Sequence, residues 1–192
     1  MEEKQIEKPS RLIVIGGSSG SLDAILIILP LLKKDFSIPV VMVLHRSSNA
    51  DNGLTVLLAG KTRLQVKEAD EKEPLLPGWI YLAPPDYHLL VEANGTFSLD
   101  ASEKVHYSRP SIDVTFTSAA AAYGSGLTAI LLSGANADGA QAMALVKQHG
   151  GRNIVQDPRD AMVGFMPGQA ILLSVVDNIV PAVQIAGLLN QL

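Results

Sequence analysis

The chain is organised around one stretch, Leu12-Ile13-Val14-Ile15-Gly16-Gly17-Ser18-Ser19-Gly20-Ser21, in which an apolar run ends abruptly in small residues. A helical pattern of apolar residues follows at once, between residues 22 and 32. The stretch therefore predicts a buried strand, a tight turn and a helix. Open α/β sheets bind ligands where strands end in such turns, and free N–H groups at a helix start attract negative charge.

The turn has a functional and a structural interpretation. Gly16-Gly17-Ser18-Ser19-Gly20 matches the G-x-S-x-G pattern, in which the serine is a nucleophile. Any tight strand-to-helix turn needs small residues, however, and Ser18, Ser19 or Ser21 would serve equally as a helix cap. A dinucleotide-binding loop fits less well, because Ser18 and Ser21 stand where the second and third glycines belong.

Length and composition describe a globular chain. It has 192 residues, of which 47% are hydrophobic and 18% charged, which suits one α/β domain with a proper core. The net charge of −4 gives no indication of binding to nucleic acid or to an anionic membrane. The absence of cysteine excludes disulfide and thiolate chemistry and fits a cytoplasmic location.

Targeting and metal-binding signals are equally sparse. The polar residues 1–10 contain no signal-peptide core and are expected to form a disordered tail, and no apolar run has the length of a membrane span. The histidines at positions 45, 88, 106 and 149 form no close ligand pair, so neither a metal nor another cofactor is expected.

The remaining pattern predicts the fold class. The unbroken apolar runs 40–44 and 127–132 indicate further strands buried on both faces, as in a parallel sheet. The middle section is expected to add antiparallel strands to the sheet at about 65–69, 79–83, 88–92 and 96–99, with a hairpin turn at Asn94-Gly95. Helices are expected at about 21–34, 54–59, 110–122, 140–149, 167–174 and 181–192, with Pro110 at the first position of its helix. We predict a single α/β domain over residues 11–192, doubly wound, with a mostly parallel sheet and an antiparallel hairpin extension.

Three polar residues follow the ends of predicted parallel strands. Ser18 follows the first strand, His45 the second, and Asp138 lies in the loop after the strand from Leu127. Parallel strands aim these ends the same way, so the three side chains can meet. A serine nucleophile, an imidazole base and an orienting carboxylate together perform acyl transfer. Their order along the chain differs from that of the α/β-hydrolases.

Each residue also has a plainer interpretation. Asp138 precedes Gly139 and would act as the N-cap of the following helix, and His45 would be an ordinary loop residue. His88 and His106 are expected to be structural or rim residues. Arg109 is either a solvated residue at a helix start or an anchor for an acidic partner.

A family resemblance covers nearly the whole chain, from about Arg11 to Leu189. It rests on the following motifs: Ile15-Gly16-Gly17-Ser18-Ser19-Gly20, Leu44-His45, Tyr81-Leu82-Ala83-Pro84, Ser108-Arg109-Pro110-Ser111-Ile112-Asp113, Leu132-Ser133-Gly134-Ala135-Asn136-Ala137-Asp138-Gly139-Ala140, Gln156-Asp157-Pro158 and Met166-Pro167. In these motifs the chain resembles the catalytic domain of the chemotaxis methylesterases, the CheB family. The resemblance implies a catalytic triad of Ser18, His45 and Asp138, with an oxyanion hole of backbone N–H groups near Ser19 and Ala135.

The resemblance also implies an activity. Family members hydrolyse methyl esters on glutamate side chains of chemoreceptors, and some deamidate receptor glutamines. We therefore expect a cytoplasmic protein-glutamate methylesterase whose partners are methylated chemoreceptor cytoplasmic helices. Two alternatives stay open: a catalytically silent module that docks on a signalling partner, and a small-molecule esterase. Hydrolysis of a methylated receptor compared with a generic ester would separate them.

The chain departs from the family pattern at the mouth of the expected site. Arg46-Ser47-Ser48 stands where many members have Met-Pro after the histidine, and Ala135 replaces a common methionine. Full-length members also carry an N-terminal receiver domain, whereas ten residues precede the first strand here. We therefore expect a stand-alone, ungated enzyme, with access to the site limited by the loops 46–53 and 84–86.

Overall fold

A seven-stranded parallel sheet forms the centre of the computed structural model, which describes residues 7–46, 53–173 and 175–192. Its strand order is β3-β4-β2-β1-β7-β8-β9, and every neighbouring pair is parallel. The strands are β1 (Leu12–Gly17), β2 (Val40–Leu44), β3 (Gln65–Glu68), β4 (Trp79–Leu82), β7 (Leu127–Leu131), β8 (Arg152–Gln156) and β9 (Asn178–Val180). Each residue of the three central strands β1, β2 and β7 is buried, as their unbroken apolar runs predict.

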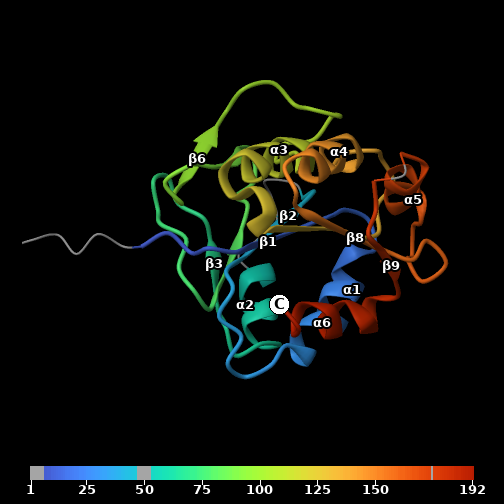
Figure 1. Cartoon of the computed structure of the whole chain (residues 1–192), viewed down its shortest axis with the longest axis horizontal. Helices are drawn as coiled ribbons and strands as arrows, with labels where there is room; N and C mark the ends of the chain where they lie inside the picture. Colours follow the sequence, from blue (N-terminus) through green and yellow to red (C-terminus); the bar gives the residue numbers. More distant parts are fainter. Residues whose placement is uncertain (1–6, 47–52, 174) are drawn as a thin grey trace, which may run out of the picture.

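Helices cover both faces of the sheet (Figure 1). On one face lie α1 (Ser21–Ile28), α2 (Gly53–Ala59) and α6 (Ala182–Leu189), and on the other α3 (Ile112–Tyr123), α4 (Ala140–Gln148) and α5 (Phe165–Leu172). Two short 3-10 helices, η1 (Leu29–Leu31) and η2 (Gly124–Gly126), follow α1 and α3. The two hydrophobic clusters of the core lie one on each side of the sheet. The predicted doubly wound fold class is confirmed.

The middle section pairs differently from the prediction. The strands β3 and β4 run parallel within the main sheet, so their prediction as antiparallel additions is wrong. The segment between them crosses to the hairpin β5 (His88–Val91) and β6 (Phe97–Asp100), where Leu75 N–H donates to the Gly95 carbonyl at 2.9 Å. This crossover brings the chain back to the end of the sheet at which β3 begins, so that β4 can pair with β3 in parallel. The predicted hairpin is confirmed and forms a small sheet of its own.

Several predicted boundaries also move. The first helix ends at Ile28, because Pro30 follows and the chain tightens into η1. The helix α3 starts at Ile112 with Ser111 as its N-cap, so Pro110 precedes the cap instead of opening the helix. The sequence pattern missed β9, a strand of three residues whose ends are partly buried and whose middle residue, Ile179, is exposed. The predicted end of α5 at Ser174 lies outside the described residues, as do residues 1–6 of the predicted tail and residues 47–52 of the loop expected to limit access.

Lys8 contacts the body of the protein, although it belongs to the stretch predicted as a tail. Its Nζ donates to the carbonyls of Ala93 and Ala122 and lies 4.3 Å from the centre of the Tyr123 ring.

None of the helices in residues 7–46, 53–173 and 175–192 combines the length and hydropathy that a membrane span requires.

Candidate active site

The candidate site lies where the strand order reverses direction. After β1 the chain moves to β2 on one side, whereas β7 lies on the other side of β1. Ser18 follows β1, His45 follows β2, and Asp138 lies in the loop between β7 and α4. Backbone hydrogen bonds join these strand ends, since His45 N–H donates to the Gly17 carbonyl at 3.2 Å and Ser18 N–H to the Ser133 carbonyl at 2.9 Å. Ligands bind at such reversal points in open α/β sheets.

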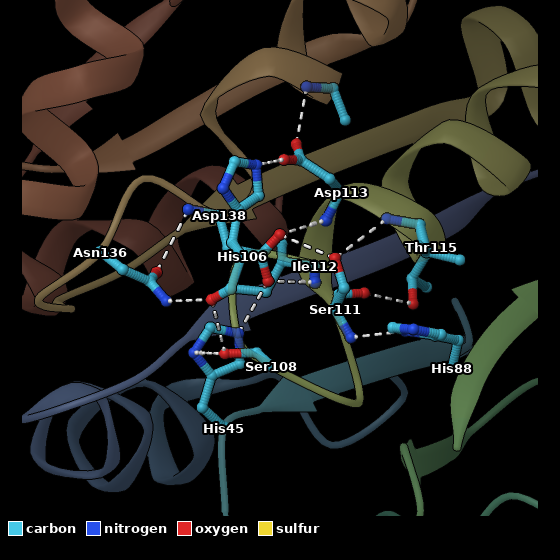
Figure 2. A network of polar contacts seen from close by, with 12 residues as sticks. His45, His88, His106, Ser108, Ser111, Ile112, Asp113, Thr115, Asn136 and Asp138 are labelled. Atoms are coloured by element: carbon cyan, nitrogen blue, oxygen red, sulfur yellow. Dashed lines mark hydrogen bonds and ion pairs between the residues drawn. The ribbon is translucent and has the colours of Figure 1, made fainter. Parts of the chain in front are cut away.

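The structure brings His45 and Asp138 into direct contact. His45 Nε2 lies 2.7 Å from Asp138 Oδ2. Figure 2 draws this contact as a dashed line between the two side chains. The Asp138 side chain is fully buried, whereas that of His45 is 11% exposed. The pairing predicted from the strand ends is thus present in the fold.

Asp138 also binds the start of α3. Its carboxylate accepts hydrogen bonds from Ser111 Oγ at 2.8 Å, from Ile112 N–H at 2.7 Å and from Asp113 N–H at 3.0 Å (Figure 2). The helix that follows Asp138 in sequence has Gly139 as its N-cap and no side-chain cap. The alternative that Asp138 caps its own following helix is therefore wrong, because the carboxylate binds the N-terminus of a different helix.

These contacts determine the ionisation of two neighbouring carboxyl groups. Burial by itself would raise the pKa of Asp138, but the hydrogen bonds from His45, the Asp113 and Ile112 amides and Ser111 outweigh it, and the pKa lies below its ordinary value. The pKa of Asp113 is raised instead, first by burial and then by the negative charge of Asp138. The site therefore holds Asp138 as the anion that an orienting carboxylate must be.

The serine-rich turn contributes no side-chain cap to α1. The N-cap is Gly20, which adopts a left-handed φ of 79°, and Ser21 Oγ donates to the Ser18 carbonyl at 2.7 Å. The interpretation of these serines as helix caps is therefore wrong. A Cβ at Gly17 would lie 2.5 Å from the Ser21 Cβ, so only glycine lets the chain turn this tightly.

The half-buried Ser18 directly follows Gly17, whose carbonyl accepts a hydrogen bond from His45 N–H. Within the described ranges, no hydrogen bond joins Ser18 Oγ to His45. The second ring nitrogen, Nδ1, lies 3.3 Å from Ser108 Oγ (Figure 2). The pattern analysis did not single out Ser108 or Ser111 as site residues, although both belong to the Ser108–Asp113 motif that carries the family resemblance.

The two residues predicted to form the oxyanion hole lie at the surface, Ser19 in the turn after β1 and Ala135 in the loop after β7. Ser19 and Ala135 are exposed, and the Ser19 carbonyl accepts a hydrogen bond from Ser133 Oγ at 2.7 Å. In the part of the chain that the structure describes, neither the Ser19 N–H nor the Ala135 N–H donates to an acceptor. Within those residues both N–H groups are unpaired, as the donors of an oxyanion hole must be.

Arg109 is a half-buried residue that anchors the preceding loop. Its Nη1 donates to the carbonyls of Ala101 and Ser102, both at 2.6 Å. The same side chain helps to line a cavity beside His45. Arg109 is therefore not a freely solvated residue at a helix start.

Two of the other histidines, His88 and His106, extend the network. His88 is buried, with Nδ1 accepting from Ser111 N–H at 3.1 Å and Nε2 at 2.9 Å from the Glu103 carbonyl, which agrees with the predicted structural role. His106 Nε2 lies 3.2 Å from Asp113 Oδ2 at the rim. His106, Asp113 and Asp138 have ligand atoms within 4.8 Å of one another, but both Asp138 oxygens already bind protein donors. Hydrogen bonds and an ion pair within the protein therefore explain why these three side chains lie close together.

Comparison with known proteins identifies the family. Residues 13–189 match the family model described as CheB methylesterase. The chain belongs to the CheB methylesterase family. A CheB methylesterase catalytic domain from Thermotoga maritima, known from a crystal structure, superposes with a TM-score of 0.91 at 35% identity, covering 97% of this chain and 99% of that one.

CheB relatives differ in how much of their length this chain spans. A relative from Leptospira interrogans is 43% identical, and the match covers 94% of this chain and 93% of that protein. The protein-glutamate methylesterase/protein-glutamine glutaminase of Thermotoga maritima is 36% identical over 97% of this chain but only 56% of its own length. The protein-glutamate methylesterase FrzG of Myxococcus xanthus is 33% identical, with 55% of its length covered. The chain thus corresponds to the CheB catalytic domain.

Proposed function

We propose that this chain is a protein-glutamate methylesterase that hydrolyses methyl esters of glutamate side chains on chemoreceptors. The observation that carries the proposal is the buried Asp138, which binds the N-terminus of α3 and His45 at the strand ends where Ser18 follows β1. Membership of the CheB family and the names of the relatives support the same activity.

The proposed reaction begins with attack of Ser18 Oγ on the ester carbonyl while His45 accepts the serine proton. Since Asp138 binds Nε2, Nδ1 takes that proton, and the imidazole must exchange its neighbour Ser108 Oγ, at 3.3 Å from Nδ1, for Ser18 Oγ when substrate binds. The N–H groups of Ser19 and Ala135 would stabilise the tetrahedral oxyanion, each by about 3 kcal/mol. Collapse of this intermediate breaks the ester C–O bond, and the proton on His45 leaves with methanol.

The second half of the reaction regenerates the enzyme. Water attacks the acyl group on Ser18, His45 takes a proton from the water, and that proton returns to Ser18 as the glutamate carboxylic acid is released and ionises. With a glutamine substrate, the same steps release ammonia in place of methanol. We include this deamidation in the proposal because relatives carry the name protein-glutamine glutaminase.

The proposed partners are the cytoplasmic helices of methylated chemoreceptors, with Arg109 at the substrate-binding surface. The enzyme would therefore act in the cytoplasm. A receptor segment would lie across the strand ends, where the exposed Ser19 and Ala135 border the turn that carries Ser18.

The test is methanol release from membranes that contain methylated receptor, with and without the Ser18 hydroxyl. We expect Ser18→Ala to remove nearly all activity, whereas Ser19→Ala, which keeps the backbone N–H, retains most of it. Ser37→Ala is a matched control, because Ser37 is exposed and precedes β2 at the opposite edge of the sheet. Loss of turnover in Ser19→Ala with normal turnover in Ser18→Ala would refute the assignment. Activity on a generic ester but not on the receptor would favour a small-molecule esterase.

A further inference from the structure

A cationic cavity opens directly beside His45. It has a volume of about 340 Å³, and its lining comprises His45, Arg46, Asp86, Lys104, Tyr107, Ser108 and Arg109. Among the described residues of this lining, the cationic side chains of Arg46, Lys104 and Arg109 outnumber the carboxylate of Asp86. Because His45 belongs to the lining, whatever occupies this cavity is adjacent to the reacting ester.

The cations of this cavity differ in how far the protein already uses them. Arg46 forms an ion pair with Glu68 and donates to the Ala83 carbonyl at 3.2 Å. Arg109 donates from Nη1 to two backbone carbonyls, while its buried Nε has no acceptor among the described residues. Lys104 is exposed and, in the described ranges, makes neither an ion pair nor a side-chain hydrogen bond. Lys104 is thus the cation available to a ligand.

The loop that carries Lys104 is held in a defined shape. Arg109 binds the carbonyls of residues 101 and 102, and Val105 and Ser108 exchange two backbone hydrogen bonds of 3.2 and 2.9 Å. The two residues between them, His106 and Tyr107, adopt left-handed φ values of 48° and 62°. Such backbone is unfavourable for residues with side chains and persists only where the surroundings enforce it.

The turn places a large aromatic side chain in solvent at the mouth of the cavity. Tyr107 is 97% exposed. A tyrosine combines an apolar ring with a polar hydroxyl and is enriched where proteins contact partners. Lys104 and Tyr107 therefore border the cavity as a charged and an aromatic contact.

We propose that this cavity is a subsite for an acidic side chain of the substrate polypeptide, close in space to the glutamyl ester at Ser18. Lys104 provides the main attraction, Arg109 adds to it, and Tyr107 packs against the substrate backbone. Among the described residues of the lining, Asp86 contributes a negative charge that disfavours a doubly charged group such as a phosphate ester, so a carboxylate fits best. This inference rests on the proposed function, because it assigns the part of the substrate that flanks the ester.

A subsite of this kind acts on substrate selection. An exposed ion pair is worth little in free energy and is screened by salt, so the subsite changes peptide binding several-fold and leaves the chemical step unchanged. It favours an ester with acidic neighbours over the same ester with neutral neighbours.

The experiment uses two fluorescent peptides that differ only in the residues flanking a methionine, a neutral side chain that the enzyme can neither hydrolyse nor deamidate and that stands in for the ester: glutamates in one and serines in the other. Fluorescence anisotropy measures their binding to the wild type, Lys104→Glu and Lys61→Glu. Lys61 is the matched control, because it is exposed and lines a separate cavity with Leu29 and Pro30. We expect the wild type and Lys61→Glu to bind the acidic peptide about three- to fivefold more tightly in low salt, and Lys104→Glu to lose this preference.

Equal binding of the two peptides by the wild type, or an unchanged preference in Lys104→Glu, would overturn the subsite. Lys104→Gln is an independent test, because it removes the positive charge without adding a negative one. The logarithm of the ratio of the two dissociation constants should fall to about half of its wild-type value. Methanol release from the corresponding methyl-ester peptides is measured separately. A retained Lys104-dependent preference without methanol release would contradict the proposed esterase and leave the subsite standing, whereas release with equal KM values for the two peptides would contradict the subsite alone.

Discussion

At the residue scale, Asp138 combines a structural role with the chemical role that we propose for it. The carboxylate has no exposed surface, and it accepts hydrogen bonds from His45 and from three groups at the start of α3. A buried carboxylate needs such donors, since an unpaired charge in the interior is strongly unfavourable. The same donors leave it ionised beside the imidazole, which is the state an orienting carboxylate needs.

The substitution Asp138→Asn tests both roles. It keeps the size of the side chain but removes the charge. The new amide N–H₂ is a donor, and it would face the hydrogen-bond donors that now bind the carboxylate. We expect turnover to fall by about 10³-fold or more, and the free energy of unfolding to fall by about 1–3 kcal/mol. Steady-state kinetics and urea unfolding measure the two effects.

A matched control for this substitution is Asp177→Asn. Asp177 also accepts a backbone amide hydrogen bond, from Asn153 at 2.8 Å, and pairs with Lys147 away from the site. It should lose stability and keep normal turnover. Near-normal turnover of Asp138→Asn would leave Asp138 with a structural role alone.

Ser108 gives the second prediction at this scale, because its hydroxyl lies 3.3 Å from His45 Nδ1. If Ser108 only positions the imidazole, Ser108→Ala removes one neutral hydrogen bond and lowers kcat by about three- to tenfold. Ser108→Thr, which keeps the hydroxyl, should restore most of the rate. Complete loss of turnover in Ser108→Ala, together with an active Ser18→Ala variant, would instead make Ser108 the nucleophile.

At the element scale, the site depends on how closely α3 packs on β1. A Cβ at Gly16 would lie 2.4 Å from Ile112 Cγ2, at the first residue of α3. The glycine thus lets the helix N-terminus approach the strand end and reach Asp138. The pattern analysis explained Gly16 by the tight turn, whereas the structure explains it by this contact between elements.

Gly16→Ala should therefore destabilise the protein by about 1–3 kcal/mol, because the added methyl group overpacks the contact. It should also lower turnover by displacing α3. Gly187→Ala is the matched control: Gly187 lies within α6, and a Cβ there meets nothing within 4 Å. Alanine at that position should raise the free energy of unfolding by about 0.5–1 kcal/mol. Urea unfolding of both variants is the measurement, and equal stabilities would contradict the packing argument.

At the scale of the whole molecule, the stability depends on pH through carboxyl groups with altered pKa values. Burial would raise the pKa of Asp138 and Asp177, but hydrogen bonds outweigh it, and both lie below their ordinary value. A carboxyl group whose pKa is lower in the folded state adds stability above its unfolded pKa. That stability is lost as the pH falls through the folded value. Asp113 acts in the opposite direction, because its pKa is raised by burial.

We expect the free energy of unfolding to be nearly constant above about pH 5 and to fall below about pH 4, near the ordinary pKa of aspartate. Asp138→Asn should show a shallower fall, since one of the responsible groups is gone. Urea unfolding of both proteins between neutral pH and pH 2 tests this expectation. Identical acid dependence would show that Asp138 keeps an ordinary pKa in the folded protein.

The sequence by itself determined the central strands, the hairpin and the end of the strands at which the candidate site lies. Unbroken apolar runs identify β1, β2 and β7 because a strand buried on both faces needs apolar side chains throughout. Ser18, His45 and Asp138 follow these runs in the sequence. They were therefore predicted at the same end of the sheet, because parallel strands end in the same direction. The hairpin between β5 and β6 was likewise predictable from its Asn94-Gly95 turn.

Only the tertiary structure decided which groups touch. The pairing of β3 with β4, the binding of Asp138 to α3 instead of α4, and the position of Ser108 at His45 all join segments distant along the chain. His45 and Asp138, for example, are 93 residues apart. Periodicity and turn residues report on neighbours within a few positions, so they reveal which face of an element is buried. They carry no information on which other element buries it, because that choice is made by packing the whole chain around the sheet.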